Sequence, residues 1–233
     1  CLQLRIKMKK ATSGVKLRRL FYLKLRLMKI KNLILILLLI TVVPLRAQFE
    51  LQPGTILTYE VTNGATTYDF VVTVVQLEPE LKLKYEMGAP ANINGTVSMT
   101  DEALQNATRQ VTWFGGGEMV LNDATTIFMS RKNYEEAFVG GNYFETSISF
   151  DDDPTVYDFQ ETIEGTYEAR VNGELMKFDS RHATAYTFNP ETEEVDYGPA
   201  IFTVADPEYP LIVWLYKGFT VKLIEVENAI TYD

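Results

Sequence analysis

The sequence TILTYEVTNGATTYDFVVTVVQ, residues 55–76, contains two runs of alternating apolar and polar side chains, one on each side of Asn63-Gly64. Strict alternation places the apolar side chains on one face of a β-strand, so each run predicts a strand with one buried and one wet face. Asn63-Gly64 indicates a hairpin because both residues tolerate a positive φ. The stretch therefore predicts two antiparallel strands joined by a tight turn.

The same pattern continues along the chain. The run LKLKYEM, residues 81–87, alternates without a fault, and LIVWLY, residues 211–216, is apolar throughout. An uninterrupted apolar run is typical of a central strand covered on both faces. Further strands are predicted at residues 93–99, 143–150, 163–171, 175–178, 182–188, 201–204 and 219–226.

Two short helices interrupt these strands. One is predicted at residues 100–104, because two acidic residues lie in its first turn, where the helix dipole stabilises negative charge. The second is predicted at residues 131–139, with Ser130 as its N-cap and Gly140 after its last turn. The expected fold class is all-β with two short helices, as one domain that forms an antiparallel curved sheet or a β-barrel.

The charge of the chain changes sharply at residue 47. Residues 1–47 contain twelve Lys or Arg and no Asp or Glu, whereas residues 48–233 contain ten Lys or Arg and all 31 acidic residues. An apolar run of eleven residues, Leu33 to Val43, follows Lys29 and Lys31. A membrane-spanning helix needs about 20 apolar residues, whereas the core of an export signal needs about 7–15.

This layout divides the chain into three parts. Residues 28–47 are expected to be a signal peptide, with a retained membrane anchor as the alternative. Residues 1–27 are basic and are interpreted as an over-extended gene model or a basic membrane-surface helix. Residues 48–233 are expected to form a single β-rich domain. Only the N-terminal signal is expected to contact the membrane.

The cysteine content agrees with an exported bacterial domain. Cys1 is the only cysteine, so residues 48–233 hold no disulfide, thiol nucleophile or cysteine metal site. A domain of this length can rely on its apolar core instead of disulfides. The expected location is the periplasm or the outside of a bacterial cell envelope.

Two function classes are disfavoured by composition. The acidic domain repels phosphates, so nucleic acid is not expected as a partner. His182 is the only histidine, and no nucleophile-elbow, zinc-helix or phosphate-loop motif occurs. His182 is interpreted as a surface residue, and no catalytic residue and no cofactor is assigned.

The residues Trp113, Phe114, Gly115, Gly116 and Gly117 form an aromatic and glycine-rich segment. Its acidic successor, Glu118, disfavours phosphate binding. We interpret the segment as a flexible loop, or as a flap whose aromatic side chains contact a ligand.

Acidic residues give two weaker candidates. Asp151, Asp152 and Asp153 form the densest acidic run, which is either a solvated turn or an irregular calcium site. Two carboxylates can also hydrolyse glycans, and Glu168 and Asp69 are examples that could face inward, but the sequence selects no pair.

Part of the chain resembles a known group of proteins. The segment PGTILTYEV at residues 53–61, YDF at residues 68–70 and DPEYPLI at residues 206–212 resemble segments of exported β-rich proteins of unknown function from Bacteroidota-type bacteria. The resemblance implies a periplasmic or secreted β domain and transfers no catalytic residue.

The expected function is that of a non-enzymatic domain of the cell envelope that binds a lipid or other apolar ligand, or another envelope protein. The alternatives are a glycan-directed hydrolase with two carboxylates and a structural or adhesive module. The sequence leaves the oligomeric state open.

Overall fold

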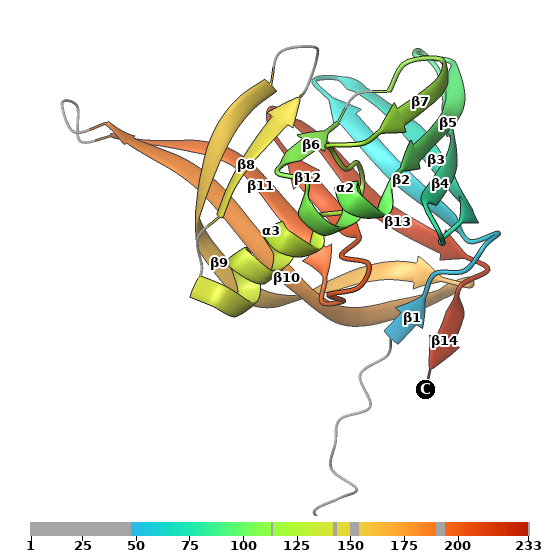
Figure 1. The fold of residues 1–233 in the computed structure, drawn as a ribbon. Coiled ribbons are helices and arrows are strands. Elements are labelled where there is room, and N and C mark those ends of the chain that lie inside the picture. The colour runs from blue at the N-terminus through green and yellow to red at the C-terminus, as the bar shows by residue number, and fades with distance from the viewer. Residues whose placement is uncertain (1–47, 113, 142–143, 150–153, 190–193, 233) are drawn as a thin grey trace, which may run out of the picture. The chain divides into compact units, whose positions relative to one another are not determined.

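In the part of the chain that the structure describes, twelve strands hydrogen-bond into one large curved sheet (Figure 1). The computed structural model describes residues 48–112, 114–141, 144–149, 154–189 and 194–232. The described strand pairs of this sheet are antiparallel except for β6–β8, β5–β7 and the additional pair β9–β13, which are parallel. The order across the sheet is β6 (Arg109–Val111), β8 (Phe144–Ser149), β9 (Pro154–Val171), β10 (Glu174–Asn189), β11 (Glu194–Val204), β12 (Ile212–Tyr216), β13 (Phe219–Glu227), β2 (Ile56–Asn63), β3 (Thr66–Gln76), β4 (Leu81–Met87), β5 (Ile93–Met99) and β7 (Gly117–Leu121).

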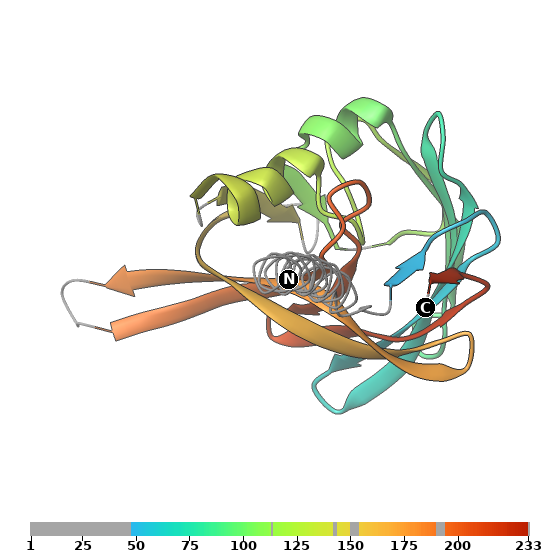
Figure 2. The same ribbon diagram turned by 90° about the horizontal axis from the view of Figure 1, so that it is seen from below.

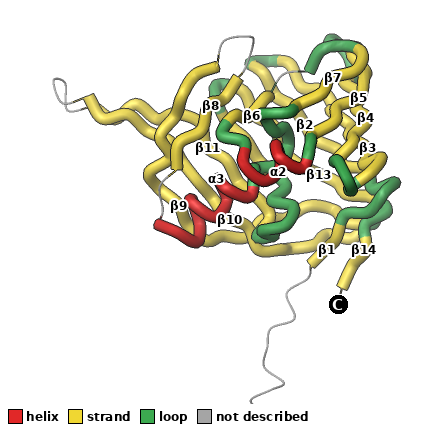
Figure 3. The backbone as a smooth tube through the Cα atoms, viewed as in Figure 1, coloured by secondary structure: helices red, strands yellow, loops and turns green. Residues whose placement is uncertain are grey.

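The predicted fold class is confirmed: the chain is mostly β, with two short helices, in a single domain (Figure 3). A second, two-stranded sheet pairs β1 (Gln48–Glu50) with β14 (Ile230–Tyr232). The two strands predicted at residues 175–178 and 182–188 are one continuous strand, β10. Its polar centre stays in the sheet because β9 and β11 provide hydrogen-bonding neighbours there. None of the described helices is long and apolar enough to span a bilayer.

Alternation determines the inner face of β2, β3 and β4, as expected. The side chains at every second position are almost completely buried, whereas those between them are half-buried or exposed. The buried set is Leu57, Tyr59, Val61, Phe70, Val72, Val74, Leu81, Leu83 and Tyr85. The central strand prediction holds at the start of β12, where Ile212 and Val213 on opposite faces are both buried, but Tyr216 at its end is 46% exposed.

The two Asn-Gly sequences differ in their place in the hairpin turns. Asn63 pairs with Thr66, so the β2–β3 turn consists of Gly64 and Ala65, and Gly64 has a φ of +58°. The expected Asn63-Gly64 turn is therefore wrong by one residue. Asn172 and Gly173 do form the β9–β10 turn, with φ values of +51° and +87°, because this turn type requires a positive φ at both positions.

Two helical segments cover part of the sheet (Figure 2). Helix α2 (Asp101–Asn106) begins at the N-cap Thr100, and α3 (Arg131–Glu135) begins at Ser130, whose hydroxyl accepts from the Asn133 N–H. The predicted stop at Gly140 is not observed, because α3 continues as the π-helix η1 (Glu136–Gly141). Tyr134 and Ala137 are buried with residues of β8 to β12 in a second apolar cluster.

The edge strands β6 and β7 are connected through the segment that follows β7. The Val111 N–H donates to the Thr125 carbonyl at 2.8 Å, and the Thr125 N–H donates to the Arg109 carbonyl at 2.9 Å. The first and last strands of the sheet, β6 and β7, are thus linked through this segment, and the curved sheet surrounds the main apolar cluster.

Candidate functional site

The candidate site is an apolar cavity of about 300 Å³ on the inner side of the sheet. Hairpin ends surround it, because Tyr68 follows the β2–β3 turn, Ile93 follows the β4–β5 turn and Phe219 follows the β12–β13 turn. Its wall is mostly aromatic and aliphatic, as in small-molecule sites. We call this space the apolar cavity; its wall includes Tyr59, Val61, Phe70, Met87, Phe114, Ile127, Leu215 and Val221.

Phe114 closes one side of the apolar cavity. Its ring lies 4.7 Å from that of Phe70 and 4.8 Å from that of Tyr85, measured between centroids, and it is 9% exposed. The Tyr85 hydroxyl donates a hydrogen bond to the Gly115 carbonyl. Phe114 is therefore held by an aromatic contact and by the backbone of the next residue.

The three glycines of the predicted segment do not line the apolar cavity. Gly115 is half-buried, Gly116 and Gly117 are exposed, and Trp113 lies outside the described residues. Gly117 begins β7, which pairs in parallel with β5. The structure thus places one of the five predicted residues, Phe114, in the wall of the cavity.

Several polar side chains interrupt the apolar wall, namely Tyr59, Asn63, Tyr68, Gln110, Thr112 and Thr126. The Tyr59 hydroxyl donates to the Ile212 carbonyl at 3.0 Å, and burial, followed by nearby Tyr167, raises the pKa of Tyr59 well above its usual value. Gln110 accepts at Oε1 from the Thr125 hydroxyl at 3.0 Å. Thr126 is fully buried, and its Oγ1 has no hydrogen-bond partner among the described residues.

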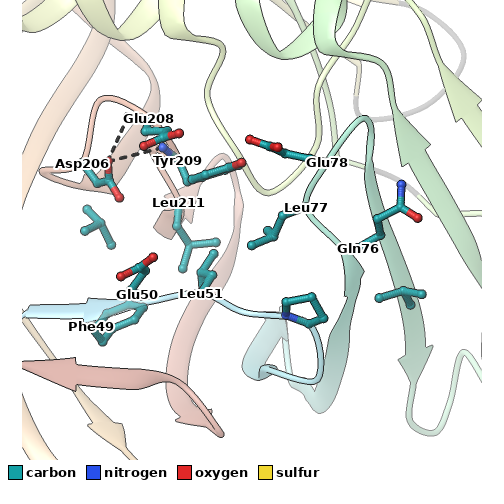
Figure 4. Close-up of a pocket in the computed structure, with 13 residues that line it drawn as sticks. Phe49, Glu50, Leu51, Gln76, Leu77, Glu78, Asp206, Glu208, Tyr209 and Leu211 are labelled. Carbon is teal, nitrogen blue, oxygen red and sulfur yellow. Dashed lines mark hydrogen bonds between the residues drawn. The ribbon is translucent and has the colours of Figure 1, made fainter.

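A second cavity, of about 760 Å³, lies where the β3–β4 and β11–β12 connections meet the N-terminal strand (Figure 4). Its wall is mixed: Leu51, Leu77 and Leu211 lie between acidic side chains. The acidic groups are Glu50, Glu78, Asp206 and Glu208. We call this space the acidic cavity.

The carboxylates of the acidic cavity face water or support a turn. Glu50, Glu78 and Glu208 are exposed, and Asp206 Oδ1 accepts from the Glu208 N–H at 2.9 Å. Burial, followed by the charges of Glu208 and Glu78, raises the pKa of Tyr209. The acidic cavity thus has a negative field, and its carboxylates come from β1, the β3–β4 connection and the β11–β12 connection.

The carboxylate pair considered from the sequence does not form. Glu168 and Asp69 are both exposed, so the expectation that they could face inward is wrong. The reason is alternation, because their neighbours Tyr167, Ala169 and Phe70 take the buried positions. Among the described side chains, no Asp or Glu is buried, and burial is the usual cause of a raised pKa in a general acid.

A calcium site was considered at one place, as the alternative to a solvated turn. Asp151, Asp152 and Asp153 lie outside the described residues, so the calcium alternative stays a prediction. Among the residues that are described, no three His, Cys, Asp or Glu side chains are positioned to hold a metal ion.

His182 is more enclosed than its interpretation as a surface residue implies. Its ring stacks on Phe202 with a centroid distance of 3.7 Å, and Nε2 lies 2.8 Å from Ser180 Oγ. Burial lowers the pKa of His182. Ser180 is itself 1% exposed, so its hydroxyl is shielded from a substrate and the pair has a structural role.

Sequence reasoning missed Thr126, Ile127 and Gln110, which lie in no alternating run. A buried hydroxyl without a partner depends on distant neighbours, so no local pattern identifies it. Ile127 has a φ of +46°, which is rare for a β-branched residue and has no signature in the sequence.

No family model, no curated protein and no solved structure matches this chain.

Proposed function

We propose that this protein is an exported, non-enzymatic binding protein of the bacterial cell envelope that holds a small apolar ligand in the apolar cavity. The observation that carries the proposal is a cavity, partly open to solvent, whose wall consists mostly of aromatic and aliphatic side chains. Transfer of apolar surface from water into such a wall is favourable by about 25 cal/mol per Å².

The volume of the cavity suggests the size of the ligand. An apolar cavity of about 150 Å³ holds one benzene molecule, so 300 Å³ suits a molecule of about two rings. Such a molecule has roughly eleven non-hydrogen atoms, and at about −0.5 kcal/mol per atom the Kd is on the order of 100 μM.

The hydrogen bonds between the two ends of the sheet order also support a finer description of the fold. We propose that the curved sheet acts as a β-barrel whose seam lies between β6 and β7. The hydrogen bonds of Thr125 to Arg109 and Val111 cross this seam and support the proposal. A closed sheet shields its interior from water and removes exposed edges, as in other ligand-holding barrels.

We further propose that the export signal at residues 28–47 directs the domain to the periplasm or the outside of the cell. The charge change at residue 47 and the length of the apolar run support this. Peptide mapping of the protein from a producing bacterium should place its N-terminus near Gln48. An exported protein that retains residues 28–47 would contradict the cleavage.

The binding proposal is tested with 2-methylnaphthalene, an apolar probe of about the right size, by fluorescence titration. We expect saturable binding to the purified domain. The variant Val221→Phe adds a ring within the cavity wall and should abolish binding. Val120→Phe adds the same ring at an exposed position of β7 and should leave binding unchanged. Absence of saturable binding, or equal binding by both variants, would contradict the proposal.

A further inference from the structure

We propose that the ligand of the apolar cavity is an uncharged molecule with an apolar body and one polar end, such as an amide or an alcohol, and that Asn63 contacts this polar end at the opening of the cavity. This inference rests on the proposed binding function and names the ligand class. It follows from which of the lining side chains are exposed and which are charged.

The opening of the apolar cavity lies at the hairpin ends. More than half of the described residues that line the cavity are buried, among them Tyr59, Phe70 and Leu215. Asn63, the last residue of β2, is the exposed one in this set, and its cross-strand neighbour Phe219 is half-buried. A ligand that enters from water meets the exposed side chain first, so Asn63 is accessible to it.

The wall of the apolar cavity carries no charge. None of the described residues that line it is Asp, Glu, Lys, Arg or His. Asp69, Glu86 and Lys222 are neighbours of lining residues in the sequence, but they are exposed because alternation turns them to the other face of the sheet. A charged group brought against this wall loses hydration and gains no ionic partner there. The cavity therefore disfavours a charged ligand.

The surroundings of the opening disfavour an anion further. Lys217 belongs to the β12–β13 turn beside Phe219, but it does not line the cavity, and its Nζ lies 4.9 Å from the centroid of the Tyr157 ring. Residues 48–233 contain ten Lys or Arg against 31 acidic residues, so the field of the domain repels negative charge. A carboxylate thus meets repulsion without a cation at the opening.

Asn63 suits an uncharged polar group. Its carboxamide both donates and accepts hydrogen bonds, so it can pair with an amide or an alcohol in either direction. Because Asn63 is exposed, its side chain exchanges hydrogen bonds with water for hydrogen bonds with the ligand, and the net gain is modest. The apolar body therefore supplies most of the affinity, and Asn63 fixes which end of the ligand faces water.

Three probes of nearly the same shape test the charge preference. At about pH 7, 2-naphthamide is neutral, 2-naphthoate carries a negative charge and 2-naphthamidine carries a positive charge. In fluorescence titrations we expect the native protein to bind 2-naphthamide about tenfold more tightly than either ion, because each ion loses hydration at a wall without a counter-charge.

A charge at the opening should change this selectivity. Asn63→Asp preserves the shape of the side chain and adds a carboxylate, so the affinity for 2-naphthamidine relative to 2-naphthamide should rise about threefold, as for an exposed ion pair. Asn122→Asp adds the same charge at an exposed residue that does not line the cavity and should leave the ratio unchanged. Affinities are expressed relative to that for 2-methylnaphthalene, so that a general loss of the cavity cancels.

The outcomes distinguish this inference from the binding proposal. If 2-naphthoate or 2-naphthamidine binds the native protein as tightly as 2-naphthamide, the preference for an uncharged ligand is wrong and apolar binding stands. The same ratio of affinities in Asn63→Asp and Asn122→Asp would overturn the contact with Asn63. Failure of 2-methylnaphthalene and of all three polar probes to bind the native protein would overturn both the inference and the binding proposal.

Discussion

The hydroxyl of Tyr85, on β4, donates a hydrogen bond to the carbonyl oxygen of Gly115, in the loop before β7. This contact connects the glycine-rich segment to the interior of the sheet. Gly95 of β5 makes it possible, because a Cβ at that position would collide with the Gly117 carbonyl and with the Tyr85 ring. The loop that carries Phe114 is therefore positioned by packing against two strands.

Loss of the Tyr85 hydroxyl should destabilise the domain. Tyr85→Phe retains the ring contacts with Phe70 and Phe114 but removes the donor to Gly115, so we expect the free energy of unfolding to fall by about 1 kcal/mol. Urea denaturation measures this change. Tyr197→Phe, at a side chain that is 69% exposed, is the control and should have no effect. Equal stability of the two variants would contradict a role for the hydroxyl.

A methyl group at position 95 should be poorly tolerated. Gly95→Ala forces β7 or the Tyr85 ring to move, and overpacking of this kind costs about 1–3 kcal/mol. At Gly116 the nearest atom to an added Cβ is the Asn94 carbonyl oxygen at 3.9 Å, so Gly116→Ala should be nearly neutral. Thermal unfolding of both variants checks the difference, and similar melting temperatures would count against the tight packing at Gly95.

Asn172 should stabilise the β9–β10 turn through its side chain as well as its backbone. Its Nδ2 donates to the Ala229 carbonyl at 2.9 Å, and its Oδ1 accepts from the Ala229 N–H at 3.2 Å. Asn172→Gly preserves the positive φ but removes both bonds, so we expect a loss of about 1–3 kcal/mol in urea denaturation.

Asn172→Asp provides the graded comparison. It retains the acceptor and loses the donor, and should therefore be intermediate in stability between the native protein and Asn172→Gly. A glycine variant as stable as the native protein would show that the turn alone, and not the contact with Ala229, determines stability here.

The stability of the domain should depend on the charge of His182. Burial lowers its pKa below the usual 6.5, so the unfolded chain binds the proton more readily than the folded chain. The free energy of unfolding should therefore fall as the pH drops from above 6.5 through the lowered pKa. At higher pH, His182 is neutral in both states and should contribute nothing to the pH dependence.

The variant His182→Phe tests this dependence. It retains a ring against Phe202 and removes the titration, and His182 is the only histidine in the chain. Urea denaturation at pH 8 and at about pH 5.5, above the range where most carboxylates titrate, should show a smaller pH effect in the variant. The same pH effect in both proteins would contradict the assignment to His182.

Much of the fold could be predicted because alternation acts locally. Leu57, Tyr59 and Val61 are inward simply because successive side chains of a strand point to opposite faces. The helix start at Ser130 was equally local, since its hydroxyl pairs with the Asn133 N–H three residues on. These features need only neighbours in the sequence.

Other elements depend on distant partners. Of β7, only Gly117 lay in the predicted loop, and no element was predicted for residues 118–121; its pairing with β5 exists because Gly95 leaves room for it. β6 has three residues and no alternation, and it is a strand because β8 and Thr125 provide its hydrogen bonds. The position of His182 against Phe202 likewise follows from the register of β10 and β11.

The sequence by itself determined the all-β class, the main strands and their buried faces, because these follow from periodicity and turn chemistry along a short stretch of chain. It also identified Phe114 as a candidate. Only the tertiary structure decided that Phe114 lines an apolar cavity and that the buried Thr126 Oγ1 has no hydrogen-bond partner in the part of the chain that the structure describes. A cavity is the volume left between packed elements, and an unpaired hydroxyl depends on atoms from several strands. Neither property is encoded by the residues of any one segment.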